Sequence, residues 1–576
     1  MRALAVCTGD WRKSMSKAIA IANNDVAFLA WSFEAPIPNC LGFSIHRKDL
    51  HTGQTTVLPA WVGFQGGTNK NWQPRTTDDW PVQKFNWRDF TTKPRGSYTY
   101  EVIPMTGTAG KLTAQLNNSL VTNQVDLTPV CGSILAFFNR GILSTQSVAH
   151  MLPLDASGAP SSPDLIKHIS TKGDPLRLRL AGEMLDALEL LLNRAKAEGG
   201  TCYAALYELA DQELVARLQD SPFVHLILSN TGPDDATDKH ARALLHASHL
   251  DITDRMLKSG HIGHNKFVVY LDKHGDPQAV LTGSTNWTST AICAQSNNAL
   301  ICQDPNTAAA YFAYWQRIKA DAAHQAPGYR SKNDQAIDLK AIDATLWFSP
   351  NTKQQTKPKA GAATPGDLDD VFQAIAGAKQ AILFLLFQPG SPSVIDAITQ
   401  AANANGDLFV RGAATDPNAV NQFDTSLFHQ GASKPDVVKD ASMVAATEIR
   451  DAFAYWQREL LKASPGAHAI IHDKIVVIDP FGESVVVTGS HNLGFTASYA
   501  NDENLLIVKG NQPLAAAYAT HAMDIYDHYR WRYWLQTQKA RAWTGLDVTP
   551  AWQDKYFKPQ AQKENLFWTR PAMAHV

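Results

Sequence analysis

Two histidine–lysine pairs stand far apart in the sequence but in closely similar surroundings. His264 and Lys266 lie in GHIGHNKFVVYLD, and His472 and Lys474 lie in AHAIIHDKIVVID. One residue separates the members of each pair within an apolar, β-branched run, so on a strand both side chains leave the same face. An imidazole can act as a nucleophile or as a general acid or base, and an ammonium group attracts an oxyanion. Each pair therefore carries groups suited to phosphate chemistry.

Two further blocks follow each pair in the same order. After the first pair come AVLTGSTNWT (279–288) and QSNNALI (295–301), and after the second come VVVTGSHNLG (485–494) and NDENLLI (501–507). Such repetition of three blocks indicates two related halves.

The glycine in each Thr-Gly-Ser-x-Asn segment allows backbone amides and a hydroxyl to approach a bound oxyanion closely. The side chains predicted to take part are those of Ser284, Asn286, Ser490 and Asn492. Converging with two imidazoles and two ammonium groups, they would form a cradle for a phosphate.

The pattern His-x-Lys-x4-Asp followed by Gly-Ser-x-Asn resembles the signature of the phospholipase D superfamily. That superfamily includes phospholipases, phospholipid synthases, bacterial nucleases and DNA-repair phosphodiesterases, and the resemblance covers roughly residues 130–535. His472, Lys474 and Asp479 fit the spacing as written. In the first copy five residues, where four are expected, separate Lys266 from Asp272. The position of Asp272 in the turn LDKHGDP suggests a structural role for it.

The resemblance implies two lobes that face each other across a pseudo-twofold axis, with one histidine from each lobe in a shared site. One imidazole would attack phosphorus to form a phosphohistidine, and the other, protonated, would give its proton to the departing alkoxide. No metal and no cofactor are expected, because Lys266 and Lys474 would supply the positive charge that a cation otherwise brings.

One asymmetry between the halves bears on which histidine does which. Alignment of QSNNALI with NDENLLI places Asn297 opposite Glu503, so the second half alone offers a carboxylate there. We expect this carboxylate beside His472, where it would raise the pKa of the ring and favour the protonated acid. His264 would then be the nucleophile.

Strands and helices alternate around these motifs, which is typical of an α/β fold with helix-covered sheets. In the first half the predicted strands are 133–141, 202–209 and 223–230, and the predicted helices are 184–198 and 212–220. In the second half the predicted strands are 345–351, 380–389 and 407–417, and the predicted helices are 368–379 and 394–405. An internal duplication explains the repeated order economically.

Short β-rich runs broken by turns precede this region, at 26–33, 41–47, 55–64 and 98–104. They predict an N-terminal β-sandwich of the immunoglobulin or fibronectin type III class. The predicted domains are therefore the sandwich at 1–128, a first phospholipase D-like lobe at 129–344 and a second lobe at 345–576.

Composition limits the partners. Among 576 residues, 52 Lys and Arg stand against 54 Asp and Glu, and this balance gives no overall attraction to the phosphates of nucleic acid or anionic lipid. Six cysteines without a CxxC pair or metal-type spacing are expected as buried thiols. No signal-peptide core and no membrane-spanning stretch are apparent, so a cytoplasmic protein is expected, although export without a cleavable signal stays open.

Three functions remain open at this point. The near-neutral charge and the absence of a basic stripe favour a phospholipase D that cleaves, or transfers, a phospholipid headgroup, with peripheral membrane contact by the β-domain. A metal-independent endonuclease of the same superfamily, acting on DNA or RNA, is the first alternative. A non-catalytic adaptor is the second. Because one chain holds both motif copies, the site needs no dimer.

Overall fold

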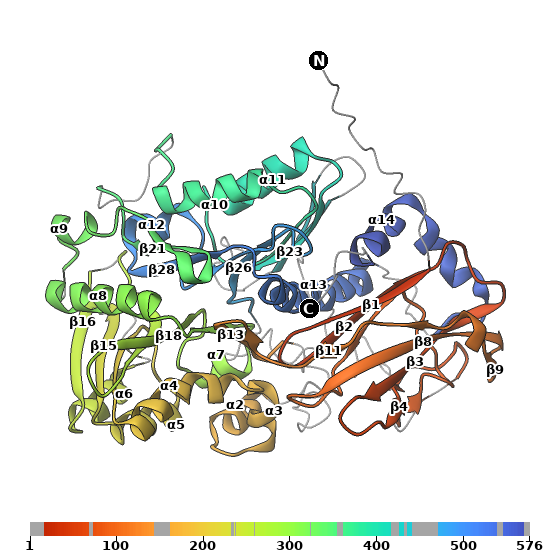
Figure 1. The fold of residues 1–576 in the computed structure, drawn as a ribbon, viewed down its shortest axis with the longest axis horizontal. Helices are drawn as coiled ribbons and strands as arrows, with labels where there is room; N and C mark the ends of the chain where they lie inside the picture. Colours follow the sequence, from red (N-terminus) through yellow and green to blue (C-terminus); the bar gives the residue numbers. More distant parts are fainter. Residues whose placement is uncertain are drawn as a thin grey trace. The chain divides into compact units, whose positions relative to one another are not determined.

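The structure, a computed structural model, describes residues 16–67, 69, 73–142, 162–231, 236, 238–258, 260–322, 324–353, 361–415, 425–430, 435–439, 470–537 and 545–569. The chain divides into two compact units (Figure 1). Unit 1 comprises Met1–Thr128 and Ala542–Val576, and unit 2 comprises Pro129–Arg541.

Unit 1 contains two antiparallel sheets that share one core. One sheet has the order β1-β2-β7, and the other has the order β10-β8-β3-β4, with β9 and β11 also paired to β8. The strands are β1 (Lys17–Ala22), β2 (Ala27–Ser32), β3 (Cys40–Asp49), β4 (Thr55–Val57), β7 (Asn86–Asp89), β8 (Ser97–Thr108), β9 (Lys111–Ala114), β10 (Leu120–Val121) and β11 (Val125–Asp126). Trp31 from the first sheet packs edge-on against Phe43 from the second, with ring centroids 5.3 Å apart. This arrangement agrees with the predicted β-rich sandwich.

The C-terminal segment also belongs to unit 1, which differs from the predicted extension of the second lobe to residue 576. It contains a 3₁₀ helix at Pro550–Phe557 and the helix α14 (Pro559–Trp568). Trp552 is 5% exposed, lies in the core between the sheets, and donates its indole N–H to the carbonyl of Cys40 at 2.9 Å. Trp568 packs edge-on against Phe28. Burial of these large aromatic rings explains why the segment packs on unit 1.

The first sheet of unit 2 has the order β12-β13-β19-β18-β17-β14-β15-β16. Its strands are β12 (Val130–Cys131), β13 (Ile134–Phe138), β14 (Thr201–Leu206), β15 (Val224–Thr231), β16 (Asp251–Leu257), β17 (Lys266–Leu271), β18 (Pro277–Gly283) and β19 (Asn298–Cys302). The helices around it are α2 (Ser162–Ser170), α3 (Pro175–Ala181), α4 (Met184–Glu198), α5 (Gln212–Gln219), α6 (Lys239–His246), α7 (Ser289–Cys293) and α8 (Pro305–Asp321). The predicted helix at 184–198 matches α4 to the residue.

The second sheet of unit 2 has the order β20-β21-β28-β27-β26-β22-β23-β24-β25. Its strands are β20 (Ile337–Leu339), β21 (Ala344–Ser349), β22 (Ala381–Phe387), β23 (Phe409–Thr415), β24 (Thr425–Gln430), β25 (Pro435–Lys439), β26 (Lys474–Ile478), β27 (Val485–Gly489) and β28 (Glu503–Val508). The associated helices are α9 (Pro327–Arg330), α10 (Gly366–Ala376), α11 (Val394–Ala404), α12 (Phe495–Ala500) and α13 (Gln512–Thr537).

The central strands of the second sheet are buried because helices cover them. The sequence AILFLLF of β22 contains no polar residue, and its first six residues are buried. Helices α10 and α11 contribute Val371 and Ile398 to the core with Phe384, and α13 contacts β22, β23 and β26 (Figure 1). Such a continuous apolar run is typical of a strand covered on both faces.

The strand registers place the two lysines at equivalent positions. Lys266 begins β17 and pairs with Leu206 at the end of β14, while Lys474 begins β26 and pairs with Leu386 near the end of β22. The histidines lie just before these strands rather than within them, which refines the prediction that each pair shares one strand.

Of the six cysteines, the five in the described residues are buried free thiols, as expected, and Cys7 lies outside the described residues. No helix in the described part of the chain has the length and apolar character needed to cross a membrane.

Candidate active site

The two motif histidines meet. The ring centroids of His264 and His472 are 6.4 Å apart with an interplanar angle of 70°. Their exposed fractions are 3% and 4%, and Lys266 and Lys474 are buried beside them. Residues distant in sequence therefore form one compact polar cluster.

Each histidine receives its partner from the other half of the sequence. Glu503 approaches Nδ1 of His264 with Oε2 at 3.2 Å, and Asn297 approaches Nδ1 of His472 with Oδ1 at 2.9 Å. The prediction that Glu503 lies beside His472 is therefore wrong. With Nδ1 engaged on both rings, Nε2 is the atom left to face a substrate.

Backbone pairing between the halves explains this crossing. The amide of Ser296 donates to the carbonyl of Ile470 at 3.0 Å, and the amide of His472 donates to the carbonyl of Ser296 at 3.1 Å. These bonds bring the start of β19, with Asn297, against the second histidine. The amide of Asp502 likewise donates to the carbonyl of Ile262 at 2.9 Å, which brings Glu503 against the first.

Both lysines fold back onto the backbone of their own motif. Nζ of Lys266 donates to the carbonyl of His264 and Nζ of Lys474 donates to the carbonyl of His472, each at 2.6 Å. An aromatic ring flanks each pair. The ring centroid of Tyr207 lies 5.3 Å from Nζ of Lys266, and that of Phe387 lies 4.9 Å from Nζ of Lys474. The lysines are thus held with their charges beside the two imidazoles.

Burial shifts the pKa of the first pair. Desolvation, reinforced by the charge of Lys266, lowers the pKa of His264 to about 4, although Glu503 opposes the shift. Desolvation also lowers the pKa of Lys266 to about 7, against the opposing charges of Glu503 and Glu208. His264 is therefore neutral near pH 7, as a nucleophile must be.

The second pair is shifted in the same direction. Desolvation, together with the charges of Lys474 and Lys266, lowers the pKa of His472 well below its ordinary value. Burial raises the pKa of Glu503, but the adjacent His264, together with His491 and Asn501, lowers it, and the net shift is downward. Glu503 is therefore a buried carboxylate that stays ionised among cationic groups.

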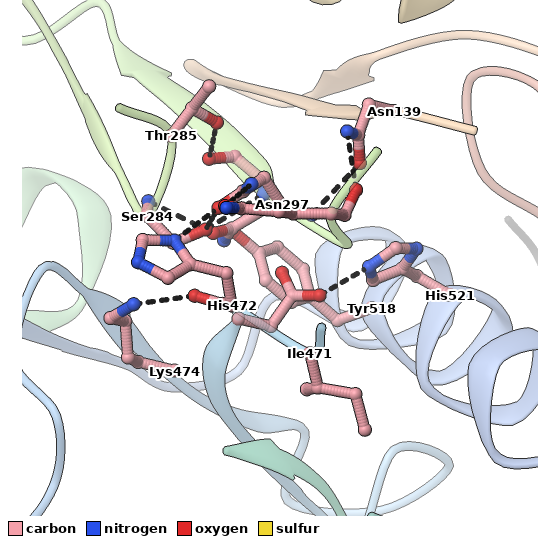
Figure 2. Close-up of polar contacts among 12 residues, drawn as sticks. Asn139, Ser284, Thr285, Asn297, Ile471, His472, Lys474, Tyr518 and His521 are labelled. Atoms are coloured by element: carbon pink, nitrogen blue, oxygen red, sulfur yellow. Dashed lines mark hydrogen bonds and ion pairs between the residues drawn. The ribbon is translucent and has the colours of Figure 1, made fainter. Parts of the chain in front are cut away.

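The serine hydroxyls support the partners of the histidines. Oγ of Ser284 donates to Oδ1 of Asn297 at 2.8 Å, the same oxygen that contacts His472 (Figure 2). Oγ of Ser490 accepts from the amide of Asn504 at 3.0 Å. Both hydroxyls are thus bonded to the segments that begin β19 and β28.

The motif asparagines differ from each other. Nδ2 of Asn286 donates to Oε2 of Glu208 at 2.5 Å. Oδ1 of Asn286 and Oδ1 of Asn492 are both buried without a hydrogen-bond partner. Two unpartnered acceptors in the motif segments suit a substrate that donates a hydrogen bond.

Asp272 and Asp479 lie at the far ends of their strands from the lysines. The carboxylate of Asp479 accepts from the backbone amides of Lys379, Gln380 and Ala381 at 2.7–2.8 Å, which anchors the start of β22. Asp272 accepts from amides within its own turn, including that of His274 at 2.9 Å. The geometry supports structural roles for both residues.

Several residues of the cluster were not predicted. Thr282 donates to Oδ1 of Asn504 at 2.7 Å, and Asn298 donates to Thr488 at 2.8 Å, so the two halves exchange equivalent bonds across the seam. The sequence did indicate these four residues, because in both copies a Thr precedes Gly-Ser and an Asn precedes the final apolar run. No repeated motif contains Tyr207, Phe387 or Glu208. Phe387 ends β22, and the other two residues directly follow β14.

No group of three or more potential metal ligands occurs in the part of the chain that the structure describes.

Comparison with known proteins agrees with this geometry. Residues 371–525 match a family model described as "Cardiolipin synthase, PLD-like domain". This match covers the second motif copy and identifies residues 371–525 as a phospholipase D-like domain. No curated protein matches the sequence significantly.

Similar solved structures share only part of this fold. Phosphatidylserine synthase from Haemophilus influenzae has 12% identity over 60% of this chain and 85% of its own, with a TM-score of 0.37. Polyphosphate kinase from Porphyromonas gingivalis has 13% identity over 56% of this chain, with a TM-score of 0.33, and only 42% of its own length is covered. The phospholipase D family member Nuc from Salmonella typhimurium has 19% identity over 23% of this chain and 87% of its own, with a TM-score of 0.20.

Proposed function

We propose that this chain is a phospholipase D-type phosphodiesterase that cleaves, or transfers, the headgroup phosphodiester of a phospholipid through a phosphohistidine. The observation that carries the proposal is the pair of imidazoles with ring centroids 6.4 Å apart, each with a side-chain oxygen beside its Nδ1. Two buried lysines beside them would balance the charge of a phosphodiester anion.

In this proposal the two sheets of unit 2 are products of an internal duplication related by a pseudo-twofold axis. The supporting observation is their strand order: β13-β19-β18-β17-β14-β15 in the first matches β21-β28-β27-β26-β22-β23 in the second. The exchanged bonds of Thr282 and Asn298 across the seam fit the same symmetry.

His264 is the proposed nucleophile, but on a different ground from the one predicted. When Nε2 attacks phosphorus, the ring gains positive charge while its Nδ1 keeps a proton. Glu503 at Nδ1 would neutralise that charge, whereas the amide oxygen of Asn297 beside His472 offers only a dipole. The Nε2–P bond forms as the bond from phosphorus to the departing alkoxide breaks.

His472 is the proposed general acid. Its Nε2–H would give the proton to the departing alkoxide and afterwards take a proton from the water or alcohol that attacks the phosphohistidine. The ring must first be protonated, which burial and the lysines oppose in the free protein. Binding of an anionic phosphodiester offsets the lysine charges and thereby favours the protonated ring.

A lipid substrate is favoured over nucleic acid for two reasons. The matching family model is named for a phospholipid synthase, and the net charge of -2 offers no general attraction to a polyanion. Peripheral contact with a bilayer would then bring the site to its substrate.

The test is to incubate the purified chain in EDTA with mixed phospholipid vesicles and, separately, with plasmid DNA. Release of a headgroup supports the proposal, and the His264→Ala variant serves as the control without a nucleophile. Nicked plasmid without headgroup release would indicate an endonuclease instead. Activity in neither assay would indicate a non-catalytic adaptor.

A further inference from the structure

A pocket of about 320 Å³ lies outside the histidine cluster. Its lining comes from two stretches of chain, one around α9 and one directly after β21. The lining residues are Pro327, Gly328, Arg330, Ser331, Asp334, Asn351, Thr352 and Lys353. The volume is ample for a small polar ligand rather than for a single water.

Asn351 is the residue that marks this pocket as a binding site. It is 8% exposed, and neither Nδ2 nor Oδ1 of its amide has a hydrogen-bond partner. Its backbone is nevertheless fixed, because its N–H donates to the carbonyl of Ser498 at 3.1 Å. A buried amide with both ends unsatisfied is costly, and a ligand that both accepts and donates would remove that cost.

The charges of the lining favour an anion. Arg330 and Lys353 contribute two positive charges against one negative charge from Asp334. The guanidinium of Arg330 is buried and donates to the carbonyl of Tyr499 at 2.7 Å and to Oε1 of Gln325 at 3.1 Å.

We propose that this pocket binds a phosphate group that still carries a hydroxyl, either inorganic phosphate or a phosphomonoester. Unesterified phosphate oxygens would accept from Nδ2 of Asn351 and from Lys353, and a P–OH group would donate to Oδ1 of Asn351. A fully deprotonated oxyanion such as sulfate lacks that donor and would leave Oδ1 unsatisfied. The site therefore distinguishes phosphate from sulfate.

The pocket opens at the same end of the second sheet as the catalytic cluster. β21 ends at Ser349, which pairs with Glu503, and Asn351 follows two residues later. The lining includes neither histidine and neither motif lysine, so this inference does not rest on the proposed function.

The most direct test is anomalous diffraction from crystals of the full chain soaked in arsenate or in selenate. Arsenate is partly protonated near neutral pH, as phosphate is, whereas selenate resembles sulfate. We expect an arsenic peak in the pocket, within hydrogen-bond distance of Asn351 and Lys353, and no selenium peak there. Equal occupancy by both ions would overturn the proposed selectivity, and an empty pocket in both soaks would overturn the site.

The same soaks separate this inference from the proposed function. An arsenic peak between His264 and His472 with an empty pocket would leave the catalytic proposal standing and contradict this one. A peak in the pocket with none between the histidines would support this inference and count against the catalytic proposal.

Calorimetric titration with inorganic phosphate and with glycerol 3-phosphate identifies which form is preferred. We expect Lys353→Met to weaken binding of the preferred form about tenfold, the scale of one lost charge-assisted hydrogen bond. Lys332→Met is the matched control, because Lys332 is exposed next to Ser331 but does not line the pocket. Asn351→Asp should abolish binding at the pocket without a change in fold, as judged by Tm. Retained affinity in both pocket variants would contradict the proposal.

Discussion

Glu503 makes the environments of the two histidines unequal. It is fully buried, it contacts Nδ1 of His264, and its partner Asn501 donates to Oε1 at 2.7 Å. The corresponding contact to His472 comes from the uncharged Asn297. The positive charge of a phosphorylated ring is therefore better balanced at His264 than at His472.

Removal of this charge should slow the reaction while preserving the shape of the site. For Glu503→Gln we expect kcat to fall about 10²- to 10³-fold, the scale of one lost electrostatic contact to a transition state. Steady-state kinetics on the substrate found in the vesicle assay would measure it, with Tm as the check on folding. A kcat close to that of the unmodified chain would contradict the role given to Glu503.

Lys266 should set the alkaline limb of the pH profile. Because its pKa is lowered to about 7, the ammonium form is present below that pH and is lost as the pH rises through it. We therefore expect kcat/KM, which reports the free enzyme, to decline above about pH 7. The limb should disappear in Lys266→Met, whose residual activity would be low but flat. A limb that persists in this variant must belong to another group.

At the scale of elements, strands β17 and β26 each have one end at the candidate site and the other end beside an aspartate with a structural role. Each begins with a motif lysine, and the second is followed by Asp479, which accepts three backbone N–H bonds at the start of β22. The motif aspartate of the second copy thus holds the edge of the strand that carries Phe387.

This division predicts that Asp479 matters for stability rather than for chemistry. Asp479→Ala should lower the free energy of unfolding by about 2–4 kcal/mol, because buried amide donors lose a charged acceptor. The matched variant Asp272→Ala, in an exposed turn, should cost about 1 kcal/mol or less. Urea denaturation would give both values. A loss of kcat in folded Asp479→Ala would show instead that the residue serves catalysis.

The elements of unit 2 could be predicted well from local patterns. Helix α4 has an amphipathic repeat and ends at Gly199, so its bounds follow from periodicity and its C-terminal glycine. The meeting of His264 and His472 follows from the repeated motif. Which partner serves which histidine could not be predicted, because it depends on backbone bonds such as that from Ser296 to Ile470 between the halves.

The packing of the C-terminal segment on unit 1 could not be predicted for a related reason. Its sequence contains aromatic residues that would suit any core, and nothing local indicates that Trp552 packs between the sheets of unit 1. Similarly, Tyr207 and Phe387 reach the lysines through strand register, which a single sequence does not specify.

At the scale of the whole molecule, one chain contributes both histidines to one site. Unit 2 holds both lobes in a single compact body, and the ion pair between Arg255 of β16 and Asp502 ties the first lobe to the second at 2.5 Å. The two histidines therefore come together within one chain.

It follows that two inactive variants should not rescue each other. A mixture of His264→Ala and His472→Ala chains should remain as inactive as either alone, because every site still lacks one imidazole. Assays across a range of protein concentrations would check this. Recovery of activity on mixing would show that lobes pair between chains.

The central claim is that one phosphorus atom binds between the two imidazoles and becomes covalently bonded to His264. It is tested most directly by reacting the unmodified chain with substrate, quenching without acid, and mapping the phosphorylated histidine by mass spectrometry of peptides. We predict a phosphatidyl group on the peptide that contains His264, and none in the His264→Ala variant. A phosphatidyl group on His472, retained in His264→Ala, would contradict the account.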